Sequence, residues 1–166
     1  TQQITLQAYG QNVEKIQGDS GLMVYQHLKL TNQKPYLIYD TVAVAGNLTI
    51  EAGTTIYMHA GAGIYVYGSM TANGTQDNPI IVRGDRTDKL FDSVPYRMAS
   101  GQWDGIYLLH AKGMMPPMYQ LNYVDILSGS VGLYVYSEAT GMVLPKISMK
   151  NSRIHNHSTY GVVLQN

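Results

Sequence analysis

Three charged residues, Asp104, Asp125 and Arg153, have positions in the sequence that would suit catalytic groups on neighbouring repeats. Asp125 and Arg153 stand 28 residues apart, in the similar contexts Val124–Ile126 and Ser152–Ile154. A carboxylate and a guanidinium brought together on adjacent strands could act as an acid or base and its electrostatic partner in polysaccharide cleavage. They could equally form an exposed ion pair, worth less than about 1 kcal/mol. With Asp104 added, these are the catalytic candidates; because no paired-aspartate motif of glycosidases is present, the balance favours a non-catalytic protein.

Carboxylates and imidazoles also raise the question of a metal site. Asp85, Asp88 and Asp92 are spaced three and four residues apart, so a short helix would place them on one face. Three carboxylates could contribute to a Ca²⁺ site, although the spacing is not that of an EF-hand, and helix capping by Asp85 explains the pattern equally well. His155 and His157 could begin a zinc site, but no third ligand is evident. We expect no cofactor, with Ca²⁺ as the alternative.

Tyrosine supplies 14 of the 16 aromatic residues and recurs in register with the repeats described below. Outward aromatic rings on successive strands could form a strip on which sugar rings stack, with the side-chain hydroxyls bonding to the sugar. The alternative is that the strip is covered or packs as ordinary outer-face structure. The candidate ligand-binding residues are Tyr65, Tyr67, Trp103, Tyr107, Tyr134 and Tyr136.

The elements that would position these residues are short strands in a repeating pattern. One short motif recurs: glycine, an aliphatic residue, usually tyrosine, and another aliphatic residue. It begins at Gly63, Gly105, Gly132 and Gly161, and the last two steps are 27 and 29 residues. Several strands per period of this length indicate a solenoid. Because side chains alternate along a strand, Ile106, Leu133 and Val162 should stack inward as one ladder while the tyrosines point outward.

A parallel β-helix fits this period better than a leucine-rich repeat, whose leucine pattern is absent. Such a fold has three short strands per coil, separated by bends where asparagine tolerates left-handed backbone angles. Residues placed for that role are Asn47, Asn73, Asn151 and Asn156.

Several motifs resemble a family of Bacteroidetes surface-type proteins, mostly uncharacterised, with a right-handed parallel β-helix of pectin-lyase-like architecture. The matching stretches are 34–39, 52–59, 83–86, 102–107 and 151–156. The resemblance implies an all-β, single-stranded right-handed parallel β-helix in an exported, cell-surface or periplasmic protein. Lyases of this architecture use clustered aspartates for Ca²⁺ and an Arg or Lys base. The family often has glycine where Asp104 stands, which counts against Asp104 as a shared catalytic residue.

The domain organisation follows from the same pattern. Residues 1–33 differ in sequence pattern from the rest and are expected to form an N-terminal β cap, with the coils spanning 34–166. The long step from Gly63 to Gly105 predicts an insertion at about 84–102. Because Asn166 falls inside a coil, we expect the open end to be covered by further coils beyond 166 or by another copy.

Composition limits the function classes. The net charge is zero, only 13% of residues are charged and there is no cysteine, which argues against a nucleic-acid binder and excludes a cysteine nucleophile or a thiolate zinc site. No apolar run is long enough for a transmembrane segment. The sequence favours a non-catalytic exported or cell-surface domain, with a glycan as the partner. A polysaccharide lyase or glycoside hydrolase, and a purely structural spacer, are the alternatives.

Overall fold

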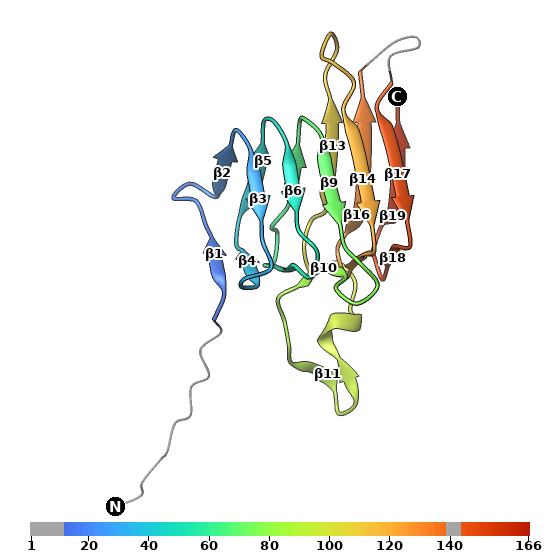
Figure 1. Cartoon of the computed structure of the whole chain (residues 1–166). Helices are drawn as coiled ribbons and strands as arrows, with labels where there is room; N and C mark the ends of the chain where they lie inside the picture. Colours follow the sequence, from blue (N-terminus) through green and yellow to red (C-terminus); the bar gives the residue numbers. More distant parts are fainter. Residues whose placement is uncertain (1–11, 139–143) are drawn as a thin grey trace, which may run out of the picture.

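The computed structural model describes residues 12–138 and 144–166. Strands make up 51% of the chain and helix 2%, so the protein is all-β. The strands of the described ranges form three parallel sheets of five or six strands and a separate two-stranded hairpin (Figure 1). This arrangement is consistent with a parallel β-helix or solenoid. Within the described ranges, no helix is long and apolar enough to cross a membrane.

The chain visits the three sheets in strict rotation, and we call each circuit a coil. Sheet A contains β1 (Glu14–Ile16), β4 (Tyr36–Ile38), β7 (Thr55–Met58), β10 (Ile80–Gly84), β15 (Val124–Leu127) and β18 (Arg153–His155). Sheet B contains β2 (Leu22–Tyr25), β5 (Thr41–Val44), β8 (Ile64–Val66), β13 (Ile106–His110), β16 (Val131–Ser137) and β19 (Tyr160–Gln165). Sheet C contains β3 (Leu28–Leu30), β6 (Leu48–Ile50), β9 (Met70–Asn73), β14 (Met118–Asn122) and β17 (Lys146–Lys150).

Aliphatic ladders between the sheets form the core. In sheet B, Ile106 is paired with Leu133, which is paired with Val162, so the predicted ladder is confirmed. Ile64 and Val42 extend it toward the N-terminus. All except Val162, on the last strand, are at most 1% exposed. Because each inward residue covers the one before it, the core continues along the whole stack.

The bends between strands depend on residues that tolerate unusual backbone geometry or close approach. Asn151 and Asn156 have φ angles of 51° and 58°, as predicted, whereas Asn47 and Asn73 are not in the left-handed region, so that prediction was wrong for them. Each repeated motif begins with a glycine, and at Gly132 close packing explains why a larger residue would not fit. A Cβ there would clash with the carbonyl oxygen of Gly161 in the next coil.

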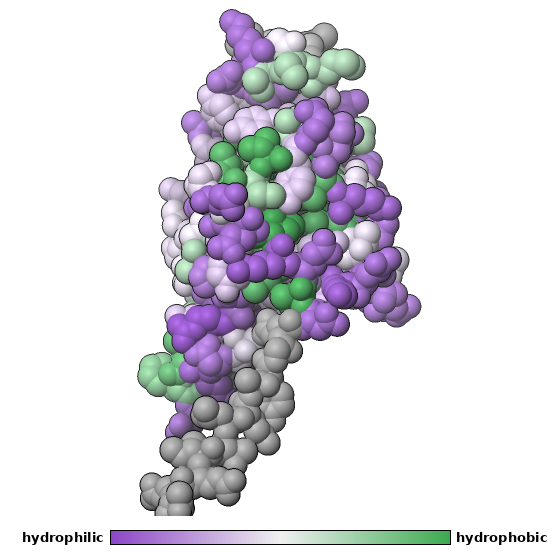
Figure 2. Space-filling view, turned by 90° about the vertical axis from the view of Figure 1, so that its left-hand side faces the viewer, coloured by the Kyte–Doolittle hydropathy of each residue, from purple (hydrophilic) through white to green (hydrophobic). Residues whose placement is uncertain are grey.

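The first coil belongs to the same three sheets as the rest. Strands β1, β2 and β3 lie in the region 1–33 where we expected a cap, yet they pair in parallel with β4, β5 and β6. The sheets therefore extend across residue 34, while residues 1–11 lie outside the described part. Figure 2 views this end of the stack and shows hydrophobic residues gathered at the centre, with hydrophilic residues around them.

Between β10 and β13 the chain leaves the sheets. It forms the antiparallel pair β11 (Lys89–Phe91) and β12 (Val94–Pro95) and the short 3₁₀ helix η1 (Tyr96–Met98). The Gln102 side-chain amide donates to the carbonyl oxygens of Tyr96 and Ala99, at 2.7 and 2.8 Å, and the Ser128 hydroxyl donates to the carbonyl oxygen of Arg97. These bonds hold η1 against the body of the protein beside sheet A.

The core ladder makes a direct prediction about stability. Ile106→Ala should lower the free energy of unfolding by about 2–5 kcal/mol, because it leaves a cavity between two buried neighbours. Val162→Ala, in the same ladder but 45% exposed, is the matched control and should cost much less. Urea denaturation measures both, and equal losses would contradict a continuous inner ladder.

Candidate functional site

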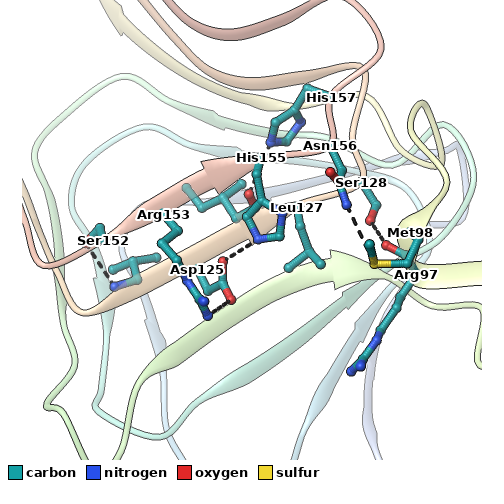
Figure 3. Close-up of polar contacts among 12 residues, drawn as sticks. Arg97, Met98, Asp125, Leu127, Ser128, Ser152, Arg153, His155, Asn156 and His157 are labelled. Carbon is teal, nitrogen blue, oxygen red and sulfur yellow. Dashed lines mark hydrogen bonds and ion pairs between the residues drawn. The ribbon is translucent and has the colours of Figure 1, made fainter. Parts of the chain in front are cut away.

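Asp125, Arg153 and His155 form a polar cluster on the outer face of sheet A. The strand pairing places Asp125 directly opposite Arg153, so the predicted adjacency of these two residues is confirmed. Arg153 Nη2 lies 2.6 Å from one carboxylate oxygen of Asp125, and His155 Nε2 lies 2.9 Å from the other. Figure 3 shows both side chains, from β18, converging on this carboxylate of β15. The Asp125 side chain is only 17% exposed, whereas that of Arg153 is 76% exposed.

The cluster lies in a groove of about 440 Å³. Its floor is made by outward side chains of sheet A, which line up because parallel strands in register stack equivalent positions. One row runs through Thr55, Ile81, Asp125 and Arg153, and a second row includes Tyr57 and Arg83. Arg97 and Met98 of η1 also line the groove. The insertion therefore forms one wall of the groove, on a sheet face that would otherwise be open.

A second groove of about 210 Å³ adjoins the first and shares two lining residues with it, Arg83 and Arg97. Arg86 lines the second groove, where it forms an ion pair with Asp88. Arg153 lines the first. All four arginines of the chain therefore line one or both grooves, although they are separated by up to 70 residues in the sequence.

The tyrosines of sheet B form a ladder of rings that contact one another. Tyr65 and Tyr107 are stacked with centroids 4.5 Å apart and planes 5° apart, and Tyr107 and Tyr134 are 5.7 Å apart at 40°. Because ring faces meet each other, they do not form the flat strip that sugar stacking would need. Tyr136 lies opposite Leu109, so it does not extend a row of rings to Tyr67.

Asp104 belongs to this tyrosine ladder and does not line either groove. Its two carboxylate oxygens accept hydrogen bonds from Tyr65 and Tyr107, at 2.9 and 3.0 Å. Burial and the Asp104 carboxylate raise the pKa of Tyr65 to about 12, and the same causes raise the pKa of Tyr107. The three catalytic candidates are therefore not brought together, because Asp104 buttresses tyrosines on a different sheet from Asp125 and Arg153.

Trp103 is buried, which contradicts its prediction as a ligand-binding residue. It is 1% exposed, and its indole N–H donates to the carbonyl oxygen of Leu127 at 2.9 Å. Its ring meets His157 edge-on. Burial lowers the pKa of His157, whose Nε2 lies 3.1 Å from the carbonyl oxygen of Ile126. His157 is thus part of the packing around Trp103.

The aspartates of the insertion do not assemble into a metal site. Their segment contains a hairpin instead of a helix that would align them. Asp85 accepts a 2.6 Å bond from His59 Nδ1, and Asp88 is paired with Arg86. Across residues 12–138 and 144–166, no group of three or more His, Asp or Glu side chains is arranged to hold a metal ion, so the structure does not bring Asp85, Asp88 and Asp92 together.

No family model, curated protein or solved structure matches this chain. The function must therefore be argued from the geometry of the grooves. Sequence reasoning missed three of their residues, Tyr57, Arg83 and Arg97. The first two could have been found, since they stand 26 residues apart at outward positions of successive sheet A strands. Arg97 carries no repeat signal because it lies in the insertion.

The tyrosine ladder predicts a pH dependence. The pKa of Tyr65 lies above its ordinary value of 10 in the folded protein, so the native state favours the neutral phenol. This stabilisation is complete below pH 10 and is lost as the pH rises toward about 12. Asp104→Asn should lower the pKa of Tyr65 but leave it above 10, because burial is the larger cause.

Ultraviolet titration of tyrosinate measures this shift, and Asp92→Asn, on the exposed insertion, is the control. If Asp104→Asn leaves the late-titrating tyrosine absorbance, to which Tyr65 and Tyr107 contribute, unmoved, the assigned role of Asp104 is contradicted.

Proposed function

We propose that this chain is a single-stranded right-handed parallel β-helix of the pectin-lyase-like kind, acting as a non-catalytic exported or cell-surface domain that binds carbohydrate in the sheet A groove. The strict rotation through sheets A, B and C supports the helical winding. Parallel strands joined by a crossover are right-handed in about 98% of cases, which supports the hand. The motif resemblance supports the surface location.

The mixed lining of the sheet A groove carries the carbohydrate proposal. Ile81 and Met98 offer apolar surface beside the guanidinium groups of the arginines, which are hydrogen-bond donors. Sugars present the same combination, with apolar C–H faces and hydroxyl rims. Outward side chains of the sheet repeat about every 4.8 Å along the stack, a spacing of the order of one sugar ring. A polysaccharide lying along the stack axis would therefore meet equivalent groups on successive strands.

This groove replaces the tyrosine strip as the carbohydrate surface. The faces of Tyr65 and Tyr107 contact each other, and their hydroxyls are bound to Asp104. The contacting faces of these two rings and the protons of their hydroxyls are therefore not available to a sugar.

Tyr57→Ala tests the proposal because this side chain lines the groove and contacts the Arg83 guanidinium. Affinity for the polysaccharide that binds best in a panel of plant and host glycans should fall about five- to tenfold, which corresponds to losing one aromatic contact. Tyr67→Ala, which removes a 48% exposed tyrosine outside the groove, should leave the affinity unchanged. Binding by no member of the panel would favour a structural spacer, and equal effects of both variants would rule out this groove.

One observation favours a catalytic alternative, a polysaccharide lyase or glycoside hydrolase. The Asp125 carboxylate orients His155, and an oriented imidazole can act as a general acid or base. In that case the protein would release unsaturated or reducing-end products from acidic polysaccharides with added Ca²⁺, and Asp125→Asn would abolish the release. Activity that survives Asp125→Asn and Arg153→Ala would exclude these residues, and wild-type protein without product would support the non-catalytic proposal.

A further inference from the structure

Two arginines at the junction of the grooves have no acidic partner among the described residues. Arg83 and Arg97 line both grooves, and neither forms an ion pair with any residue that the structure describes. Arg83 lies 4.8 Å from the centroid of the Tyr57 ring, a contact that leaves its charge uncompensated. In Figure 3 the Asp125 carboxylate is bonded to Arg153 and His155, and no contact joins it to the Arg97 side chain.

The two carboxylates that line the grooves, those of Asp125 and Asp88, are already occupied. Asp125 receives both Arg153 and His155, and Asp88 receives both Nε and Nη2 of Arg86. Neither acid is therefore available to neutralise Arg83 or Arg97. This distinguishes the junction from the rest of the arginine-lined surface, where each positive charge has its own counter-charge.

The fold holds both arginines at this junction. Arg83 is on β10 between its neighbours in sheet A, so its backbone is fixed by strand pairing. Arg97 is on η1, whose carbonyl groups are bound by Gln102 and Ser128. Two like charges at one site repel each other, and the repulsion is offset when an anion binds there.

We propose that the junction between Arg83 and Arg97 binds an oxyanion, a carboxylate or sulfate group. The planar guanidinium matches such groups because it donates two parallel N–H bonds to two oxygens. The oxyanion can be a free ion or a substituent of a glycan. The site itself does not depend on the proposed carbohydrate function, but its role in selecting acidic glycans rests on that function.

Calorimetric titration with three probes tests the proposal: inorganic sulfate, a sulfated or carboxylated oligosaccharide, and the neutral parent of that oligosaccharide. Arg83→Gln and Arg97→Gln should each weaken binding of the charged probes at least tenfold, since each removes a charge-assisted pair of hydrogen bonds. Arg97→Lys should bind more tightly than Arg97→Gln but less tightly than the wild type, because lysine keeps the charge and lacks the two parallel N–H donors of the guanidinium. Lys29→Gln, which removes an exposed positive charge paired with Glu51, is the charge-matched control and should change affinity less than twofold.

Thermal unfolding without ligand gives an independent readout. Arg97→Gln should leave Tm unchanged or raise it, because it removes a repulsion, and sulfate should raise the Tm of the wild-type protein more than that of the variant. Sulfate binding without any glycan binding would support the anion site and refute the carbohydrate function. Neutral and charged oligosaccharides binding equally, or charged probes unaffected by both Gln variants, would overturn the anion site.

Discussion

Register between coils is the constraint on which the rest of the structure depends. Each sheet strand pairs with one a full coil away, so residues 19 to 29 positions apart, or 42 to 49 where the insertion intervenes, meet side by side. Since side chains alternate along a strand, one register sets both surfaces of the sheet at once. In sheet A it stacks Val82 on Ile126 inside the core and Ile81 on Asp125 outside. A slip of one residue would bury Asp125 and expose Ile126, so the core protects the arrangement of the groove.

The groove also needs an element that breaks the repeat. A coil of regular length would leave the outer face of sheet A open, with Arg83 and Asp125 on a flat surface. The insertion between β10 and β13 adds η1, and the buried residues around Trp103 support the chain where it returns to the stack. Trp103 thus contributes to the site indirectly, because its indole is bonded to the carbonyl of Leu127, a residue that lines the groove.

The parts of the fold that sequence could predict are those encoded by the repeat. The ladder through Ile106, Leu133 and Val162 and the contact between Asp125 and Arg153 both follow from spacing alone. Spacing could not show that neighbouring tyrosine rings would stack face to face, because ring orientation depends on side-chain torsions and on Asp104. Nor could it place Trp103, which precedes β13 at a bend, where alternation no longer decides which way a side chain points.

For ligand binding by this protein, the distribution of charges over the surface matters more than the net charge. A net charge of zero weakens the case for an acidic ligand when charges are assumed to be evenly spread. The fold instead gathers all four arginines beside two adjoining grooves, while Lys29 is engaged by Glu51 away from them. Local potentials, set by nearby charges within about 10 Å at ordinary ionic strength, steer and hold ligands. Two arginines that pair with no acidic residue in the described part of the chain can therefore make one site locally positive in a neutral protein, which the composition alone cannot reveal.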